Sequence, residues 1–460
     1  MKIKAGLLPL YMDMIDKTSP QARSEFQTFI NRIIDQLKAL DLHIVPSEIS
    51  CKKEEVIKAI NLFTRQDVDA IITLHLTYSP SLESAPVLAR TKIPIIVLDT
   101  TQSYEFGPGR EPGDVLYNHA IHGVQDFCNV LRRYKKKFFI EAGHWERSDV
   151  LKRIKKRAIQ AKMVKSFTNI KVGLLDEPLE GMGDFQVQHE VLSDSFGFNI
   201  IRSDSGKIKD SIKSIPPGLI KEEIDMDRER FDFDDIDEVL YKNSIKVSLG
   251  LRNWIRKNDL DSFSMNVFKF AEGDMPHIPF LETSKELAEG IGYAGEGDIL
   301  TSSLTHSIMR AYPETTFTEM FCPDWKNNSI FISHIGEGNY NLISGIPKLI
   351  SKKYALVDFK DVVVAVGGLK SGKACIVDIA PGPDNTFGLI LIEGEMLGIK
   401  GKDNLNMTIH GWFRPDNDIN EVLAEYSKVG GTHHKVLVYG DAVDNISGFG
   451  EMMGWKVTIL

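Results

Sequence analysis

Cysteine is scarce in this chain, and its four copies stand far apart. Cys51, Cys128, Cys322 and Cys375 form no Cys-x-x-Cys pair within the 460 residues. A disulfide scaffold or a thiolate metal ribbon needs closely spaced cysteines. The spacing therefore indicates reduced thiols. Because the N-terminal segment also lacks a signal-peptide pattern, we expect a cytoplasmic protein.

Two other features are missing, a long apolar run and an excess of positive charge. No apolar stretch reaches the ~20 residues that a membrane-spanning helix needs. The formal net charge is -9, from 55 Lys and Arg against 64 Asp and Glu. A nucleic acid or an anionic membrane would be bound by a basic surface. We therefore expect neither as a partner.

Strand-like and helix-like segments alternate over residues 1–172. Short apolar runs typical of buried strands occur at KIKAGLLPLY, LHIVPS, AIITLHL, IPIIVLD and FFIEAG. Between the first two, apolar residues recur at helical spacing from Phe26 to Leu37. The alternation predicts a mostly parallel sheet with helices on both faces, in which ligands gather at the carboxyl ends of the strands.

A second strand-and-helix region follows from IKVGLLDE onward. The charged segment 207–235 contains two consecutive prolines and is predicted as loop with short helices. Helical patterns at 236–257 and 283–291 flank DSFSMNVFKF, which is predicted as a strand. These signals favour a second α/β domain.

From Ser329 the pattern changes to consecutive strand-like runs separated by turns. The runs are SIFISHIG, YALVDF, DVVVAVGGL, KACIVDIA, FGLILIEGEML and LNMTIHGWF. This order is typical of an antiparallel sandwich or barrel. We therefore predict three domains, an α/β domain at 1–172, a second α/β domain at 173–325 and a β-rich domain at 326–460.

The candidate site consists of glutamate and histidine residues, most of them in glycine-rich segments. Glu296 lies in GYAGEGD, Glu319 in TTFTEM and His334 in SHIGEG, while His433 and His434 follow about a hundred residues later in GGTHH. Carboxylate and imidazole groups can hold a divalent cation and leave coordination positions open. Spacing alone does not bring these residues together, and unrelated loop residues on a charged surface would give the same pattern.

A near match to a phosphate-binding loop occurs in GGLKSGKA, residues 367–374. Ala374 stands where the loop requires a hydroxyl residue for magnesium. The segment is followed by the strand-like CIVDIA, whereas a phosphate loop opens a helix. We interpret it as a hairpin turn, which disfavours a nucleotide-dependent kinase.

The motifs of the candidate site resemble those of the L-arabinose isomerase family, within the wider L-fucose and L-arabinose isomerase group. GYAGEGD, TTFTE, SHIGE and GGTHH occur in the family's order at similar separations. The resemblance implies that Glu296 and Glu319 are catalytic and bind a metal together with His334 and His434. Mn²⁺ is the expected ion, with Co²⁺ or Mg²⁺ as possible substitutes. The implied fold is two Rossmann- or flavodoxin-like α/β domains followed by an antiparallel β-barrel-like domain.

The resemblance also implies contacts with a sugar and between subunits. NHAIHG places His122 where the family has a histidine that reaches a neighbouring subunit's active site, so we expect a homo-oligomer, a trimer or a hexamer. GHW at 143–145 is a further match. The other candidate substrate-binding residues are Leu10, Tyr11, Tyr78, Met182 and His433.

The implied activity is the isomerisation of an aldose to a ketose through an enediol, with one glutamate as base and the other as acid. The sugar, a pentose, deoxyhexose or hexose, stays open because Leu8 replaces a glutamine of the arabinose-active members. The alternative is a non-catalytic sugar-binding or sensor protein on the same scaffold. Binding alone would not require both Glu296 and Glu319.

Overall fold

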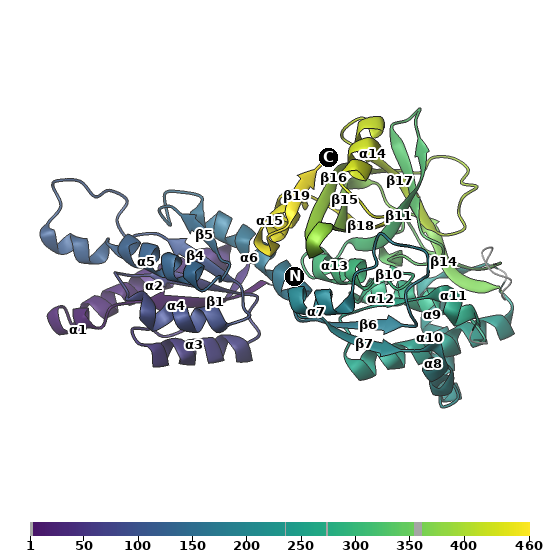
Figure 1. Ribbon diagram of the computed structural model, residues 1–460, viewed down its shortest axis with the longest axis horizontal. Helices are drawn as coiled ribbons and strands as arrows, with labels where there is room; N and C mark the ends of the chain where they lie inside the picture. The colour runs from purple at the N-terminus through teal and green to yellow at the C-terminus, as the bar shows by residue number, and fades with distance from the viewer. Residues whose placement is uncertain (1–2, 235, 273–274, 354–360) are drawn as a thin grey trace. The chain divides into compact units, whose positions relative to one another are not determined.

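The computed structural model divides into two units, Met1–Lys165 and Ser166–Leu460 (Figure 1). It describes residues 3–234, 236–272, 275–353 and 361–460, so the predicted strand YALVDF lies outside the described residues. The three-domain division stays a prediction. Among the described residues, none of the helices combines the length and hydrophobicity that crossing a membrane requires.

The first unit is built on a parallel sheet, as its alternating pattern predicts. The strand order is β2-β1-β3-β4-β5 and every pair is parallel. The order reverses between β1 and β3, the kind of position at which such sheets bind ligands. The strands are β1 (Ile3–Leu10), β2 (Leu42–Pro46), β3 (Ala70–His75), β4 (Ile95–Asp99) and β5 (Phe139–Ala142).

Amphipathic helices pack against this sheet. On α2 the apolar stripe from Phe26 to Leu37 is buried, as its helical spacing predicts. The helices of the first unit are α1 (Met14–Thr18), α2 (Ala22–Ala39), α3 (Lys53–Arg65), α4 (Ser81–Arg90), the 3₁₀ helix η1 (Pro112–Tyr117), α5 (Ala120–Arg133) and α6 (Val150–Phe167).

A second parallel sheet begins the second unit, with the order β10-β9-β6-β7. Its strands are β6 (Lys171–Leu175), β7 (Asn199–Ser203), β9 (Ser262–Met265) and β10 (Gly292–Gly295). The helices around it are α7 (His189–Phe196), α8 (Ser205–Ile212), α9 (Pro217–Arg230), α10 (Glu238–Asn258), α11 (Val267–Glu272), α12 (Phe280–Glu289) and α13 (Ile299–Met309).

Two local predictions are corrected in this region. The segment 207–235, predicted as loop with short helices, contains the 14-residue helix α9, because Pro217 occupies the first helical turn, where its missing N–H costs nothing. DSFSMNVFKF is a strand only as far as Met265. The side chain of Asn266 then accepts hydrogen bonds from the backbone N–H groups of Phe268 and Lys269, which starts α11.

The remaining strands form one large mixed sheet. Most of its pairs are antiparallel, as predicted, but β8–β13, β14–β17 and β16–β19 are parallel. The order is β19-β16-β15-β18-β11-β12-β17-β14-β13-β8, and β16 also pairs with β17. The strands are β8 (Asp232–Phe233), β11 (Thr315–Asp324), β12 (Ser329–Ser333), β13 (Lys348–Lys352), β14 (Val362–Gly368), β15 (Gly372–Pro381), β16 (Phe387–Leu397), β17 (Ile409–Pro415), β18 (His434–Tyr439) and β19 (Lys456–Ile459).

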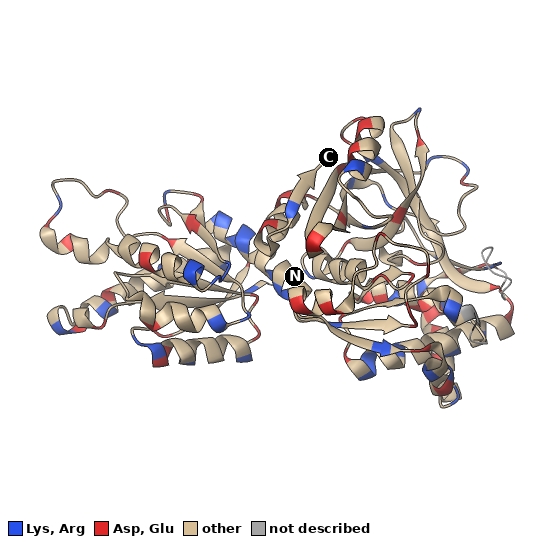
Figure 2. Cartoon of the chain, viewed as in Figure 1, with Lys and Arg blue, Asp and Glu red and all other residues tan. Residues whose placement is uncertain are grey.

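Short helices complete this part of the chain. They are η2 (Tyr340–Leu342), η3 (Pro383–Asn385), α14 (Ile419–Lys428) and α15 (Val443–Met453). GGLKSGKA runs from β14 directly into β15, so it does not open a helix as a phosphate loop would. It is not a hairpin turn either, because β14 and β15 are not neighbours in the sheet. In both units acidic and basic residues are interspersed along the chain, as Figure 2 shows.

Candidate metal centre

The pairing of β11 with its two neighbours brings three of the predicted residues together. Glu319 stands opposite Ser333 of β12 and opposite His434 of β18. His334 directly follows Ser333. As a result, Glu319 Oε1 lies 3.4 Å from His434 Nε2 and 3.7 Å from His334 Nε2.

Glu296 reaches the same place from the second parallel sheet. It directly follows β10 and has a φ of 64°, a backbone conformation that is uncommon outside glycine. At the adjacent Gly297 an added Cβ would lie 2.4 Å from the Cα of Pro178, so this turn tolerates no side chain there. Glu296 Oε2 lies 3.5 Å from Nε2 of both His433 and His434.

The side-chain atoms of this cluster face one another without completing hydrogen bonds. One ligand atom from each of Glu296, Glu319, His433 and His434 lies within 4.8 Å of all the others. Glu296 Oε2 and the Nε2 atoms of His334, His433 and His434 are buried without a hydrogen-bond partner. Separations of 3.4–3.7 Å are too long for strong hydrogen bonds but suit donors that each lie ~2 Å from one shared ion. The residues therefore fit a divalent cation.

Each of the three imidazoles is held by a carboxylate at its other nitrogen. The pairs are His334 Nδ1 with Glu337 at 2.6 Å, His433 Nδ1 with Asp184 at 2.8 Å and His434 Nδ1 with Asp298 at 2.9 Å. Such a carboxylate keeps the proton on Nδ1 and aims Nε2 at the ligand position. None of these three acids was predicted from the sequence. Two of them stand inside quoted motifs, Asp298 in GYAGEGD and Glu337 in SHIGEG, and the third, Asp184, has no motif of its own.

Charges within the cluster shift one another's protonation. Burial raises the pKa of Glu296 and Glu319, but the adjacent imidazoles outweigh it and hold both pKa values below the usual range. Burial lowers the pKa of His334, His433 and His434, but the carboxylates around them raise all three above the usual value. The shifts therefore favour ionised carboxylates facing protonated imidazoles, and a cation that binds displaces protons from Nε2.

Metal binding is accordingly expected to depend on pH. Because the raised pKa values favour the protonated form of the histidines, Mn²⁺ should release protons on binding, and its affinity should increase as pH rises through the histidine pKa values. Calorimetric titrations with Mn²⁺ in two buffers of different ionisation enthalpy measure the protons released. Equal heats in both buffers would contradict this coupling.

Aromatic side chains enclose the cluster. The ring of Phe317, on β11, lies 4.8 Å from that of His334 and 5.1 Å from that of His434. Phe185 stacks on His434 with ring centroids 5.0 Å apart. Phe185 comes from the connection between β6 and α7, which also carries Asp184 and the half-buried Met182. This connection therefore covers the cluster on the side of His433 and His434.

The other predicted sugar contacts belong to the first unit. Leu10 is the last residue of β1, and Tyr11 follows it. Both are fully buried, so they contribute to packing at this sheet edge. Tyr78 lies just beyond β3, and its hydroxyl donates to Asp126 at 3.2 Å. His122 is exposed on α5. Their contact with a sugar stays a prediction.

Leu8, which stands where the arabinose-active members have a glutamine, has a packing role. Leu8 is fully buried in the core of the first unit, in one cluster with Phe63, Ile71, Val97 and Phe127. Its side chain is therefore part of the support beneath the sheet edge.

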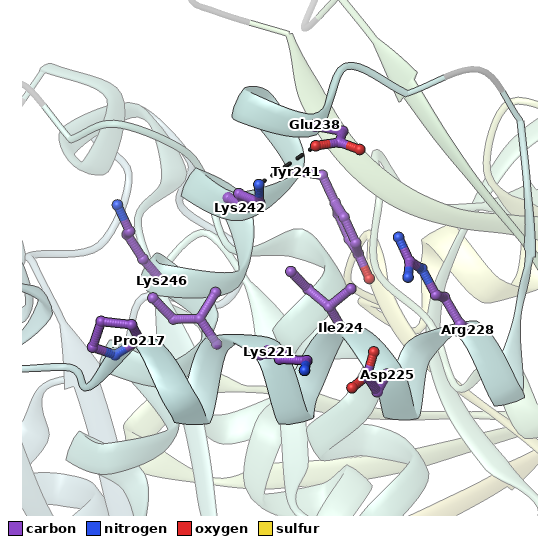
Figure 3. Close-up of a pocket in the computed structure, with 10 residues that line it drawn as sticks. Pro217, Lys221, Ile224, Asp225, Arg228, Glu238, Tyr241, Lys242 and Lys246 are labelled. Carbon is purple, nitrogen blue, oxygen red and sulfur yellow. Dashed lines mark hydrogen bonds and ion pairs between the residues drawn. The ribbon is translucent and has the colours of Figure 1, made fainter.

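A second concave feature lies apart from these residues, between α9 and α10. This groove of about 460 Å³ has Ile224 and Tyr241 on its walls, with Lys221, Lys242 and Lys246 around them (Figure 3). It contains neither a histidine nor any residue of the acidic and histidine cluster. We therefore do not place the candidate active site in this groove.

Comparison with known proteins identifies the family. The L-arabinose isomerase central domain matches residues 188–312, and the L-arabinose isomerase C-terminal domain matches residues 314–456. Together these matches cover more than half of the chain and include Glu296, Glu319 and the three histidines of the cluster. The protein is thus an enzyme of the sugar isomerase class. The chain belongs to the L-arabinose isomerase family, as a divergent member.

The divergence is measured by the identity to individual relatives. The chain is 24% identical to L-arabinose isomerase 2 of Clostridium acetobutylicum, over 89% of this chain and 85% of that protein. It is 23% identical to L-arabinose isomerase of Shewanella baltica, over 85% of this chain and 80% of that protein. Among solved structures, the sugar-binding protein of a Bacillus halodurans sugar ABC transporter aligns with 70% of this chain and 90% of its own chain. Its TM-score is 0.18 and its sequence identity is 11%, values too low to indicate a shared fold.

Proposed function

We propose that this protein is a metal-dependent aldose–ketose isomerase that acts on a pentose, deoxyhexose or hexose through an enediol intermediate. The observation that supports the proposal is the convergence of two carboxylates and three imidazoles, of which Glu296 Oε2 and the three Nε2 atoms are buried without a hydrogen-bond partner. The relatives named L-arabinose isomerases support a sugar as substrate. Proton transfers in an isomerase would require both carboxylates, whereas sugar binding alone would not. Their presence together therefore favours an enzyme over a sugar-binding protein.

Glu296, Glu319, His334 and His434 are proposed as the metal ligands, and Mn²⁺ as the ion, with Co²⁺ or Mg²⁺ as substitutes. His433 belongs to the tightest cluster and competes with His334 for the fourth position. However, the His334 side chain is 2% exposed and that of His433 is 38% exposed. The Nε2 atoms of both residues are buried without a partner, so the choice of His334 rests on its place in SHIGE and on its more enclosed ring. His433 is then placed to contact the sugar.

The proposed chemistry assigns a proton transfer to each glutamate. A bound divalent cation would supply Lewis-acid polarisation of the sugar's carbonyl. One of Glu296 and Glu319 removes the proton from the carbon next to the carbonyl, and the other moves a proton between the two oxygens. Phe185 and Phe317 restrict water around these groups, which strengthens the electrostatic interactions. Asp298 and Glu337 hold the imidazole rings in fixed orientations.

A screen of aldoses with Mn²⁺ in deuterated water tests this function. We expect ketose formation from at least one pentose, deoxyhexose or hexose, with deuterium on a carbon of the product because the enediol exchanges its proton with solvent. A protein that binds sugars without forming any ketose would be the sugar-binding alternative. Ketose without carbon-bound deuterium would contradict an enediol that exchanges with solvent.

The carboxylate behind His434 offers a test of metal positioning. Asp298→Asn keeps the helix-capping hydrogen bond to Thr301 but removes the negative charge that holds His434 Nδ1. We expect the Mn²⁺ affinity to fall about 10–100-fold. Asp418→Asn is the matched control, because Asp418 caps α14 in the same way and is exposed. An unchanged Mn²⁺ affinity in Asp298→Asn, measured by titration at constant pH, would contradict this role.

We further infer that the enzyme is a cytoplasmic homo-oligomer, a trimer or a hexamer. The four cysteines are free, in line with reduced thiols. Exposed apolar side chains at Tyr104, Phe106 and Val115 lie shortly before the exposed His122 and could be covered by another subunit. Light scattering measures the subunit number, and a fully active monomer would remove His122 from the active site.

A further inference from the structure

A separate hollow of about 710 Å³ lies at one end of the mixed sheet. Its walls come from the turn between β11 and β12, the end of β16, the connection from β16 to β17, and β17 itself. None of its lining residues belongs to the acidic and histidine cluster. Its volume falls within the range of about 300–1,000 Å³ that is usual for small-ligand sites.

One wall of the hollow is an aromatic surface held in place by neighbouring strands. Trp412 is half-buried, and its ring centroid lies 5.2 Å from that of Phe331 and 5.8 Å from that of His410. Leu397, Ile399 and Leu405 add apolar surface beside it. A fixed indole next to aliphatic groups suits the apolar C–H face of a sugar ring, and the indole N–H can donate to a hydroxyl.

The acidic groups of the hollow already have partners. Asp403 accepts from His410 Nε2 and from the backbone N–H of Leu405, both at 3.0 Å. Asp324 accepts from the Asn327 amide at 2.7 Å. These carboxylate oxygens therefore already use part of their hydrogen-bonding capacity within the protein.

The basic groups of the hollow are less committed. Arg414 is paired with Glu395. Lys400 and Lys402 line the hollow, are exposed, and have no partner among the residues that the structure describes. The lining thus contains two uncommitted ammonium groups, and a ligand that brings acceptors of its own can pair with them. A phosphate group provides them, and lysine binds phosphate as a point charge.

We propose that this hollow binds a small phosphorylated sugar, with the ring against Trp412 and the phosphate at Lys400 and Lys402. A neutral sugar would make no use of the two ammonium charges, and inorganic phosphate would make no use of the indole face. The site is independent of the isomerase centre. It would let the enzyme bind a phosphorylated carbohydrate without occupying the position of the sugar that is isomerised.

Titration calorimetry with three probes tests the proposal on the full chain. Ribose 5-phosphate is expected to bind, and ribose and inorganic phosphate are each expected to bind at least about tenfold more weakly, because each satisfies only part of the site. Inorganic phosphate binding as tightly as ribose 5-phosphate would overturn the sugar part of the proposal. Ribose binding equally well would overturn the phosphate part.

Substitutions of lining residues test whether ribose 5-phosphate binds in the hollow. The double variant Lys400→Gln, Lys402→Gln should bind ribose 5-phosphate at least about tenfold more weakly, whereas Lys400→Arg, Lys402→Arg should stay within about threefold. Both lysines are exposed, so these variants are expected to fold. Trp412→Leu should also lose about tenfold. Trp325→Leu, which changes a 60% exposed tryptophan outside the hollow, should bind normally.

The isomerase centre provides the last control. Binding of ribose 5-phosphate should persist in Glu319→Gln, because Glu319 is not part of the hollow. Loss of binding in Glu319→Gln, or full affinity in the glutamine double variant, would overturn the assignment. Thermal melting of each variant establishes that a loss of affinity does not come from unfolding.

Discussion

Glu319→Gln is expected to lower kcat by about 10²–10⁴, the range for removing a group that transfers a proton. Glu319 lies 3.4 Å from His434 and 3.7 Å from His334, so its carboxylate is also needed to balance their charge. Glutamine keeps the shape of the side chain but can neither take a proton nor carry the negative charge. Activity should be measured at saturating Mn²⁺, with the bound metal determined by mass spectrometry.

Glu314→Gln is the matched control for this variant. Glu314 directly precedes β11, and its exposed side chain pairs with Lys370 away from the cluster. Its replacement should leave kcat within about twofold of the unmodified protein, because an exposed ion pair of this kind contributes little. A Glu319→Gln protein that binds metal and turns over every aldose normally would remove Glu319 from catalysis.

Metal removal is expected to have the second large effect. Exhaustive treatment with EDTA should abolish isomerisation, and added Mn²⁺ should restore it, because Glu296 Oε2 and the Nε2 atoms of the three histidines have no other partner among the described residues. Mn²⁺ should also stabilise the folded protein, by about 2.7 kcal/mol at a free concentration a hundredfold above its Kd.

The measurement needs two readouts, turnover and the free energy of unfolding. Mn²⁺ that raises stability but does not restore turnover would indicate a structural ion. Full turnover in a preparation whose metal content is verified as negligible would contradict the metal-dependent mechanism. The Asp298→Asn protein should require more Mn²⁺ for the same stabilisation.

Much of the fold follows from local patterns in the sequence. The alternation over residues 1–172 predicts the parallel sheet of the first unit, and the spacing from Phe26 to Leu37 predicts the buried face of α2. Helix α9 was harder to predict, because a charged segment with two prolines is typical of a loop. Only the structure shows that Pro217 lies in the first helical turn, where proline is tolerated.

The residues that meet at the candidate site could be predicted from the sequence, but the carboxylates that hold their imidazoles could not. Glu296, Glu319 and His434 stand in recognisable motifs. The pairing that places Glu319 opposite His434 is between strands about a hundred residues apart, and only the sheet register decides it. Asp184 holds His433 from a connection in another part of the chain, and a single acidic residue in a loop gives no local signal of such a partnership.

The separation of Glu319 from His434 along the chain also has a consequence for biosynthesis. Chains grow at about 5–20 residues per second, so β18 follows β12 from the ribosome only after roughly 5–20 s. During that interval Glu296, Glu319 and His334 can exist without the strand that brings His434 to them. Binding of the proposed metal ion would then be a late event, and a chain truncated before β18 would fail to retain the ion however well the preceding residues had folded.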